Sequence, residues 1–340
     1  MKERLSPYSL IPLLLLAACA HHPVTPARPA PSGYLAREDV QKFIAHLAAD
    51  DGLDKPWLQN AFAHAEKRQS ILDAIARPYE AKPWYQYRPV FVNDARIAGG
   101  IDFWNQQGAL LGKAHDLYGV PEQIIVAIIG VETFYGRQHG GYPVIDALTT
   151  LAFDYPPRAT FFQGELEQYF IMCHEQSQDP LTLTGSYAGA MGAPQFMPDS
   201  YRQYAVDFDS DGRRDVWDDW ADIIGSVANY FEKHGWKSGE LIVVPAALAK
   251  DAQTPTPLTP TTVGDLRKAG VLLSKGVGDD AEAVLVALEE EDHSTRYWVG
   301  LHNFRVLTQY NRSPLYAMAV IELADGVAER RAVENHYELP

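Results

Sequence analysis

A single glutamate interrupts an apolar stretch in the middle of the chain. Residues 127–137 read AIIGVETFYGR, and in a helix that starts near Pro121 the spacing puts Glu132 on the same face as the isoleucines at 124, 125, 128 and 129. Glu132 also falls in the last turn, where the helix dipole disfavours a further negative charge, and partial burial has the same effect. Both influences favour the protonated carboxyl group that a general acid requires. The pattern leaves a second interpretation open, in which Glu132 turns outward and pairs with Arg137.

A glycine-rich segment could hold a sugar beside this acid. Residues 185–201 read GSYAGAMGAPQFMPDSY and carry a hydroxyl group at Ser186 and an amide at Gln195. Glycines let a backbone approach a ligand closely, while hydroxyl, amide and aromatic groups bind sugars by hydrogen bonds and stacking. A loop of this kind facing Glu132 would form a saccharide-binding cleft, although the glycines alone could also belong to an ordinary turn.

An acidic segment begins as an EF-hand calcium loop begins. Residues 207–222 read DFDSDGRRDVWDDWAD. Positions 1, 3, 5 and 6 of such a loop are occupied by Asp207, Asp209, Asp211 and Gly212. Arg213 at position 7 would supply only its backbone carbonyl, and position 12 falls on Asp218. We expect a structural Ca²⁺ here, because so many carboxylates would repel one another without a cation; the alternative is an acidic turn that holds no ion.

The N-terminus has the pattern of an export signal. Lys2 and Arg4 precede an apolar run over residues 10–18, which is too short to span a bilayer. The letters LAAC at 16–19 resemble a bacterial lipobox, in which Cys19 becomes the lipidated N-terminus; a plain secretory signal is the alternative. Alanine rather than aspartate after Cys19 predicts the periplasmic face of the outer membrane. We therefore expect a signal peptide over 1–18 and a proline-rich tether over 19–33.

Composition and charge exclude one class of partner. The formal net charge is −15, and a nucleic-acid-binding protein normally needs a basic face. At 340 residues and 46% hydrophobic, the chain can bury a substantial core divided among subdomains, and we expect a monomer that needs no cofactor for its chemistry.

Periodicity predicts a mainly α, α+β protein. Helical spacing covers 36–78 and 94–118, separated by PWYQYRP, and resumes over 119–240, whereas LIVVPAAL, AVLVALEEED and RYWVGLHNFRVL resemble strands. The predicted parts are a helical N-terminal subdomain over 34–118, a helical core over 119–240, a small β subdomain over 241–308, and a return to the core over 309–340. The final helix, at about 315–333, would pack with the N-terminal subdomain.

Several motifs together resemble one family. IIGVETFYG, LTTLAFDYPPRATFF, GSYAGAMGAPQFMPDSY and DIIGSVANYFEKHGW occur in the order and spacing of the membrane-bound lytic murein transglycosylase B family, and the resemblance covers roughly residues 35–330. It implies a lysozyme-like helical catalytic core, flanked by an α subdomain and a small β subdomain, that acts on the glycan strands of peptidoglycan.

The resemblance also implies a mechanism with one carboxylate. Glu132 would protonate the oxygen between N-acetylmuramic acid and N-acetylglucosamine, and would then deprotonate the muramyl C6 hydroxyl, leaving a 1,6-anhydro end. A hydrolase needs a second carboxylate, for which Asp146, Asp154 and Glu165 are candidates. Two alternatives stay open: a hydrolytic muramidase, and a catalytically silent, calcium-stabilised peptidoglycan-binding lipoprotein.

Matching motif positions adds further site residues. Those that would contact or line the sugar subsites are Tyr87, Ser186, Gln195, Tyr230, Tyr310, Asn311 and Tyr316. Arg158 would face glycan or peptide carboxylates, although the family carries two arginines where this chain has Pro157-Arg158. The family closes its metal loop on an aspartate that matches Asp222, which we favour over Asp218 although this loop is one residue longer. For each tyrosine the alternative is ordinary amphipathic packing.

Overall fold

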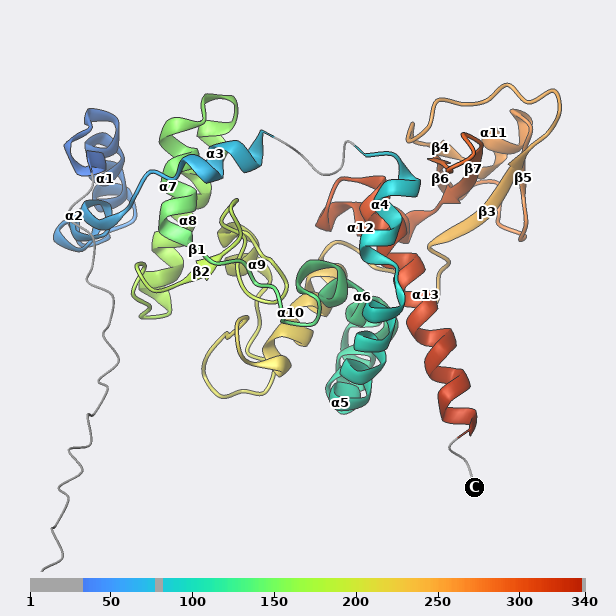
Figure 1. Ribbon diagram of the computed structural model, residues 1–340, viewed down its shortest axis with the longest axis horizontal. Coiled ribbons are helices and arrows are strands. Elements are labelled where there is room, and N and C mark those ends of the chain that lie inside the picture. Colours follow the sequence, from blue (N-terminus) through green and yellow to red (C-terminus); the bar gives the residue numbers. More distant parts are fainter. Residues whose placement is uncertain (1–32, 77–81, 338–340) are drawn as a thin grey trace, which may run out of the picture.

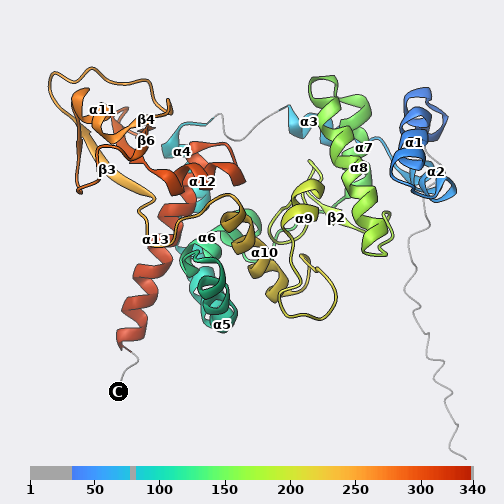
Figure 2. The ribbon, with the colours of Figure 1, turned by 180° about the vertical axis from the view of Figure 1, so that it is seen from behind.

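The computed structural model describes residues 33–76 and 82–337, and the predicted signal peptide, tether and Cys19 lie outside this range. Its elements are arranged along the long axis, with one group of helices at one end, a sheet at the other and further helices between them (Figures 1 and 2). The fold is mainly α with a small β part, which confirms the predicted class. Within the described residues no helix has the length and apolarity needed to cross a membrane.

The first group of helices joins the start of the chain to residues near its middle. It consists of η1 Gly33–Ala36, α1 Glu38–Asp50, α2 Lys55–His64, α3 Gln69–Ile75, α7 Val144–Asp154, η3 Pro156–Arg158 and α8 Ala159–Glu175. Asp154 on α7 accepts hydrogen bonds from the Tyr34 hydroxyl at 2.5 Å, from Lys67 Nζ at 3.0 Å and from Arg37 Nη1 at 3.1 Å. Burial would raise the pKa of Asp154, but these bonds outweigh it and hold that pKa below its ordinary value.

Asp146 makes the second polar connection in this group. One carboxylate oxygen accepts from the Glu66 backbone N–H at 2.8 Å, and the other accepts from Arg68 Nε at 2.9 Å. Asp146 and Asp154 therefore bind the N-terminal segments to α7. Both carboxylates are engaged in structural contacts within this group.

The middle group surrounds one apolar helix. It consists of α4 Trp84–Phe91, α5 Asp94–Tyr118, α6 Glu122–Thr133, α9 Pro198–Tyr204, α10 Trp220–Lys233, α12 His302–Tyr310 and α13 Pro314–Tyr337. Helix α6 contacts α5, α10 and α13, and every residue from 124 to 131 is buried. A helix that is apolar on all sides is stable only when other elements enclose it. The segment predicted as one subdomain, 34–118, is thus divided, since α1–α3 lie with α7 and α8 whereas α4 and α5 contact α13.

The β part is a five-stranded antiparallel sheet. Its elements are β3 Val243–Leu248, β4 Thr261–Thr262, α11 Val263–Lys268, β5 Val271–Leu273, β6 Glu282–Glu289 and β7 Thr295–Gly300. The strand order is β4-β6-β7-β3-β5, with Val286 opposite Trp298. A separate two-stranded pair, β1 Tyr142–Pro143 and β2 Thr184–Gly185, lies in the helical part.

Two local predictions were wrong. The stretch PWYQYRP, expected to separate helices, contributes most of α4, with Pro89 inside the helix. The strand expected over 296–307 ends at Gly300, and residues 302–310 form α12. Phe304 and Leu307 are three residues apart and both buried, which is the spacing of a helix face rather than of a strand.

Glu165 predicts a pH dependence of folding. Its side chain on α8 is 7% exposed and accepts a hydrogen bond from the Asp199 N–H at the start of α9, and burial raises its pKa from 4.5 to about 7. An acid whose pKa is raised by folding binds more protons when folded, so its contribution to stability is lost as pH rises from 4.5 towards 7. We expect Glu165→Gln to be about 1 to 3 kcal/mol more stable than the parent at about pH 8, and little changed at about pH 5, by urea unfolding.

The exposed Glu38→Gln serves as the control and should alter stability little at either pH. If Glu165→Gln differs from the parent by the same free energy of unfolding at both pH values, the raised pKa of Glu165 is contradicted.

Candidate active site

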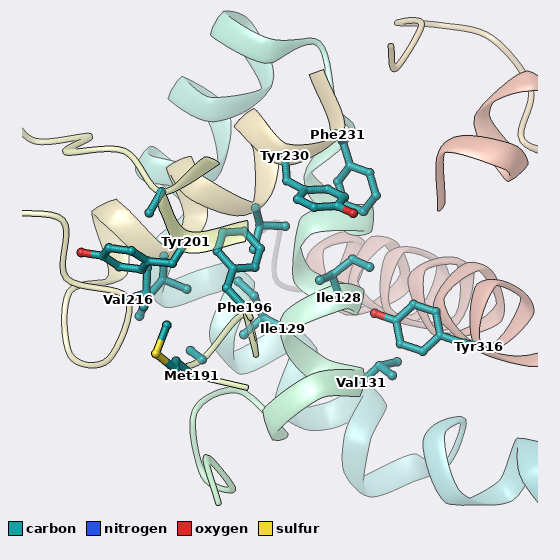
Figure 3. Close-up of a cluster of buried hydrophobic side chains, with 14 of the residues drawn as sticks. Ile128, Ile129, Val131, Met191, Phe196, Tyr201, Val216, Tyr230, Phe231 and Tyr316 are labelled. Carbon is teal, nitrogen blue, oxygen red and sulfur yellow. The ribbon is translucent and has the colours of Figure 1, made fainter. Parts of the chain in front are cut away.

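Helix α6 carries Glu132 at its end, next to a tyrosine from the other end of the chain. Glu132 is half-buried, and its Oε1 accepts a hydrogen bond of 2.6 Å from the Tyr316 hydroxyl of α13. Figure 3 shows the Tyr316 ring reaching from α13 towards α6 near Ile128 and Val131. Burial, and then the nearby charge of Glu132, raise the pKa of Tyr316 well above its ordinary value. Tyr316 therefore stays protonated and donates to the carboxyl group.

The turn after Glu132 has an unusual backbone. Phe134, Tyr135 and Gly136 have φ values of 50°, 58° and 77°, so three consecutive residues lie in the left-handed region. Two of them carry side chains, for which this region is disfavoured. Such a conformation persists only where the surroundings fix it.

The Tyr135 ring is what fixes this turn. The side chain is 6% exposed and lies where α5 and α6 approach each other at glycines. A Cβ at Gly100 or at Gly130 would lie 2.6 Å from the Tyr135 hydroxyl oxygen, so neither position accommodates a side chain. The hydroxyl donates to the Arg96 carbonyl at 2.8 Å, and Arg96 Nη1 in turn donates to the Gly130 carbonyl. The end of the helix, and with it Glu132, is therefore held in one place.

Thr133 connects the helix end to the glycine-rich loop. Its hydroxyl, fully buried, donates to the Ala193 carbonyl at 3.0 Å and accepts from the Gly136 N–H at 3.1 Å. The Ala193 N–H donates to the Val216 carbonyl at 2.8 Å, and a Cβ on Gly192 would overlap that carbonyl. Two hydrogen bonds thus link Thr133, the residue after Glu132, through Ala193 to Val216 in the acidic loop.

An aromatic cluster borders this loop. The rings of Tyr310 and Tyr316 are parallel within 7° with centroids 6.4 Å apart, and Tyr310 also contacts Tyr230 at 4.8 Å and Phe196 at 5.9 Å. The Tyr310 hydroxyl donates to the Pro194 carbonyl at 2.6 Å and that of Tyr230 to the Gln309 carbonyl at 2.8 Å. Each hydroxyl keeps an oxygen that can accept a hydrogen bond. Figure 3 shows Tyr230 and Phe196 on the same side of α6.

Ser186 and Gln195 lie against the segment that follows Glu132. A Cβ on Gly140 would overlap the Gly185 carbonyl, so the two segments touch directly. The Ser186 oxygen accepts from the Ala190 N–H at 3.1 Å, which leaves its proton able to donate elsewhere. Gln195 has φ 53°, and its amide donates to the His139 carbonyl at 3.3 Å.

Three other predicted site residues lie in different settings. Tyr87 is 2% exposed and packs on Phe91 with ring centroids 4.9 Å apart. Asn311 accepts a hydrogen bond from the Ser313 N–H at 2.9 Å, just before α13. Arg158 ends η3 directly before α8, in the first group of helices, and its guanidinium lies 4.1 Å from the centre of the Phe161 ring. Its contacts belong to that group, and its substrate role stays a prediction.

The acidic loop can hold a cation. Carboxylate oxygens of Asp207, Asp209 and Asp211 lie within 4.8 Å of one another, which suits the oxygen ligands that Ca²⁺ prefers. Gly212 has φ +93°, the sharp turn that this position of an EF-hand loop requires. The Arg213 N–H donates to Asp211 at 2.8 Å.

Asp222 joins the two ends of the acidic loop. It is 1% exposed, and its two oxygens accept from the N–H groups of Phe208 and Asp215, each at 2.7 Å. Burial raises its pKa to about 6 although these bonds oppose the shift. Asp222 stands apart from the group of three carboxylates, and Asp218 is exposed, so the residue that closes the loop on an ion stays a prediction.

Comparisons with known proteins point to one family. A family model described as a transglycosylase SLT domain matches residues 36–325. The chain is 39% identical to membrane-bound lytic murein transglycosylase B of Escherichia coli K12, over 95% of this chain and 98% of that protein. Lytic transglycosylase SltB1 of Pseudomonas aeruginosa has 48% identity and a TM-score of 0.84, over 88% and 99% of the two chains. Escherichia coli Slt35 in complex with calcium has 40% identity and a TM-score of 0.83, over 92% and 99%.

Thr133→Val tests the link between helix and loop. The substitution removes a hydroxyl that satisfies the buried Ala193 carbonyl, so we expect a loss of about 1 to 3 kcal/mol in the free energy of unfolding, measured with urea. Thr149→Val is a matched control, because the Thr149 hydroxyl is equally buried and has no hydrogen-bond partner in the described part of the chain. Equal losses in the two variants would mean that the Thr133 hydrogen bond contributes nothing specific.

Proposed function

The chain belongs to the transglycosylase SLT family and is a lytic transglycosylase of peptidoglycan, and we propose that Glu132 alone carries both proton transfers of its reaction. The hydrogen bond between Tyr316 and Glu132 at the end of the buried helix carries this proposal. It makes Oε1 a hydrogen-bond acceptor, and we therefore assign the proton of the neutral carboxyl group to Oε2.

In the first step, Glu132 is the acid. Tyr316 donates to Oε1, so the proton of the neutral carboxyl group resides on Oε2. From Oε2 it passes to the oxygen between N-acetylmuramic acid and N-acetylglucosamine, and the bond from that oxygen to C1 breaks. The leaving sugar departs as an alcohol, and the substrate's acetamido group stabilises the sugar cation. Tyr316 then stabilises the carboxylate, because a hydrogen bond to a charged acceptor is stronger than one to a neutral acceptor.

In the second step, the same group is the base. The Glu132 carboxylate takes the proton of the muramyl C6 hydroxyl while that oxygen bonds to C1, which closes the 1,6-anhydro ring and restores the acid. No water is consumed. The carboxylates that a two-carboxylate mechanism would need are engaged elsewhere: Asp146 and Asp154 bind the N-terminal segments, and Glu165 accepts from the backbone of α9.

The sugar subsites would be formed by side chains on two sides of Glu132. Ser186 and Gln195 would hydrogen-bond the sugar from the glycine-rich loop. The other side of the sugar subsites would be lined by Tyr87, Tyr230, Tyr310, Asn311 and Tyr316. Tyr316 thus has two roles in this proposal, as a wall and as the donor to Glu132.

The acidic loop would hold a structural calcium ion. Asp207, Asp209, Asp211 and the Arg213 carbonyl would be ligands, with Asp222 closing the loop. The ion would offset the repulsion among three neighbouring carboxylates and so fix the acidic loop, which contains Val216. No proton transfer passes through it.

Localisation follows from the N-terminal pattern and from the membrane-bound relative. We propose that Cys19 is lipidated after removal of residues 1–18, and that the tether over 19–33 holds the enzyme at the periplasmic face of the outer membrane.

Glu132→Gln is the test of the proposed acid. We expect release of anhydromuropeptides from purified peptidoglycan to fall by a factor of about 10² to 10⁴, because a neutral amide can neither give nor take the proton. Mass spectrometry of the digest measures this release. Glu122→Gln, at the other end of the same helix, is the control and should keep most of the activity. Undiminished release by Glu132→Gln would rule out the proposed role.

Calcium binding is tested by thermal unfolding. Added calcium should raise the melting temperature of the parent and leave that of Asp207→Ala/Asp209→Ala unchanged, since a ligand that binds only the folded state stabilises it. The exposed Asp251→Ala is the control and should respond as the parent does. If calcium also raises the melting temperature of Asp218→Ala, the result supports Asp222 as the residue that closes the loop. If calcium does not raise the melting temperature of the parent, the proposed site is contradicted.

A further inference from the structure

Arg96 brings a positive charge to the end of α6 that carries Glu132. It lies in the first turn of α5, and its side chain reaches α6, where Nη1 donates to the Gly130 carbonyl and, at 3.4 Å, to the Val131 carbonyl. The Val131 carbonyl belongs to the peptide bond that joins Val131 to Glu132. The guanidinium group therefore lies beside the backbone of the proposed acid.

The position of Arg96 is unfavourable for its own helix and favourable for the neighbouring one. The positive end of the α5 dipole disfavours a cation in the first turn, where Asp94 is the residue with the suitable charge. The same guanidinium lies at the negative end of α6, where a cation is favoured and where carbonyl groups lack partners within the helix. Arg96 therefore stabilises the end of α6 and not the start of α5.

The surroundings of Arg96 leave its charge without a counter-ion. Within the described part of the chain no carboxylate pairs with it, and its guanidinium carbon lies 4.9 Å from the centre of the Phe134 ring and 5.4 Å from that of Phe91. Burial lowers the pKa of Arg96, but a guanidinium group stays charged in proteins. A half-buried charge acts on its neighbours more strongly than an exposed one, which water and salt screen.

The other titratable groups around Glu132 are mostly tyrosines. They are Tyr310 of α12, Tyr316 of α13, Tyr135 and Arg137 of the turn and, behind the first two, Tyr230 of α10 and Tyr87 of α4. Burial, and then the charge of Glu132, raise the pKa of Tyr310 and Tyr316, so both stay neutral. Burial also keeps the hydroxyls of Tyr135 and Tyr230 protonated. The side chain of Arg137 is exposed, so the half-buried cation among these groups is the one on α5.

A positive charge at this place suits a group that must be acid and base in turn. Partial burial and the dipole of α6 both favour the neutral form of Glu132, whereas the carboxylate has to persist between the two proton transfers. A nearby cation stabilises the carboxylate. Proton transfer in both directions is most efficient when neither form is strongly favoured at the working pH.

We propose that Arg96 is a positioning residue for Glu132, which fixes the end of α6 and stabilises the carboxylate form between the two proton transfers; the inference rests on the proposed role of Glu132. Without the charge of Arg96, Glu132 keeps its proton to higher pH. Loss of this charge therefore moves the alkaline limit of activity upwards. A purely structural role would lower activity without moving that limit.

The test is the pH profile of anhydromuropeptide release, with calcium present throughout. Arg96→Gln keeps an N–H donor but loses the charge, so the pH at which activity falls to half on the alkaline side should rise by roughly half a unit to one unit. Arg96→Lys keeps the charge and should keep this limit near that of the parent. An unmoved limit in Arg96→Gln would overturn the inference.

Arg331→Gln is the matched control for the loss of charge. Arg331 also lies over an aromatic ring, with its guanidinium carbon 4.6 Å from the centre of the Trp104 ring. The Trp104 indole bonds to Glu122, which begins α6, so this arginine lies near the opposite end of the same helix. Its loss should leave the pH profile unchanged, and an equal shift in both variants would contradict a specific effect of Arg96.

A direct titration separates this inference from the proposed chemistry. In protein labelled with ¹³C-glutamate, the carboxyl signal of Glu132, identified by its absence in Glu132→Gln, should titrate at a higher midpoint in Arg96→Gln than in the parent. Equal midpoints would overturn the inference whatever the activity. A raised midpoint with an unmoved activity profile would uphold the effect of Arg96 and would instead contradict Glu132 as the acid.

A measurement on the parent covers the case in which Arg96→Gln does not fold. Coupling between two sites is reciprocal, so the ¹⁵N signal of Arg96 Nε, assigned with Arg96→Lys, should shift over the pH range in which Glu132 titrates. The shift should be absent in Glu132→Gln. A signal that stays constant over this range in the parent would overturn the inference.

Discussion

The arrangement of the proposed catalytic region depends on the Tyr135 ring, which packs where α5 meets α6. Phe134, Tyr135 and Gly136, which follow shortly after Glu132, have left-handed backbone angles. Phe134 and Tyr135 carry side chains that disfavour this conformation. Burial of the ring against Gly99, Gly100 and Gly130, together with the bond from its hydroxyl to Arg96, offsets that cost. The turn can then end α6 at Thr133, one residue after Glu132, the residue that we propose as the catalytic acid.

The same end of α6 is where distant parts of the chain meet. Tyr316 arrives from α13 and binds the carboxyl group, while Thr133 binds the glycine-rich loop at Ala193, which in turn binds Val216. Glu132 is therefore positioned by contacts on both sides. A loop that would hold calcium as a structural ion could therefore still affect the proposed catalysis, because Val216 of this loop binds Ala193, and Ala193 binds the residue next to Glu132.

Local periodicity predicted the helix, its apolar face and the place of Glu132 on that face, since these depend on residues within a few turns of one another. It could not predict the bond between Glu132 and Tyr316, which are 184 residues apart; the family resemblance named Tyr316 only as a subsite residue. Thr133, Tyr135 and Val216 were missed because their roles depend on backbone carbonyls and glycine contacts in loops. The strand predicted through residue 307 failed because Phe304 and Leu307 pack as a helix face.

The central claim is that one carboxyl group closes the anhydro ring and that water takes no part. Digestion of purified peptidoglycan in water enriched in ¹⁸O, followed by mass spectrometry of the muramyl ends, tests it directly. The account predicts that the muramyl ends are 1,6-anhydro ends, lighter by one water than reducing ends. These ends should carry no ¹⁸O, from the first detectable product onwards. Muramyl reducing ends that carry one ¹⁸O would show that water is the acceptor, and would contradict the single-carboxylate mechanism.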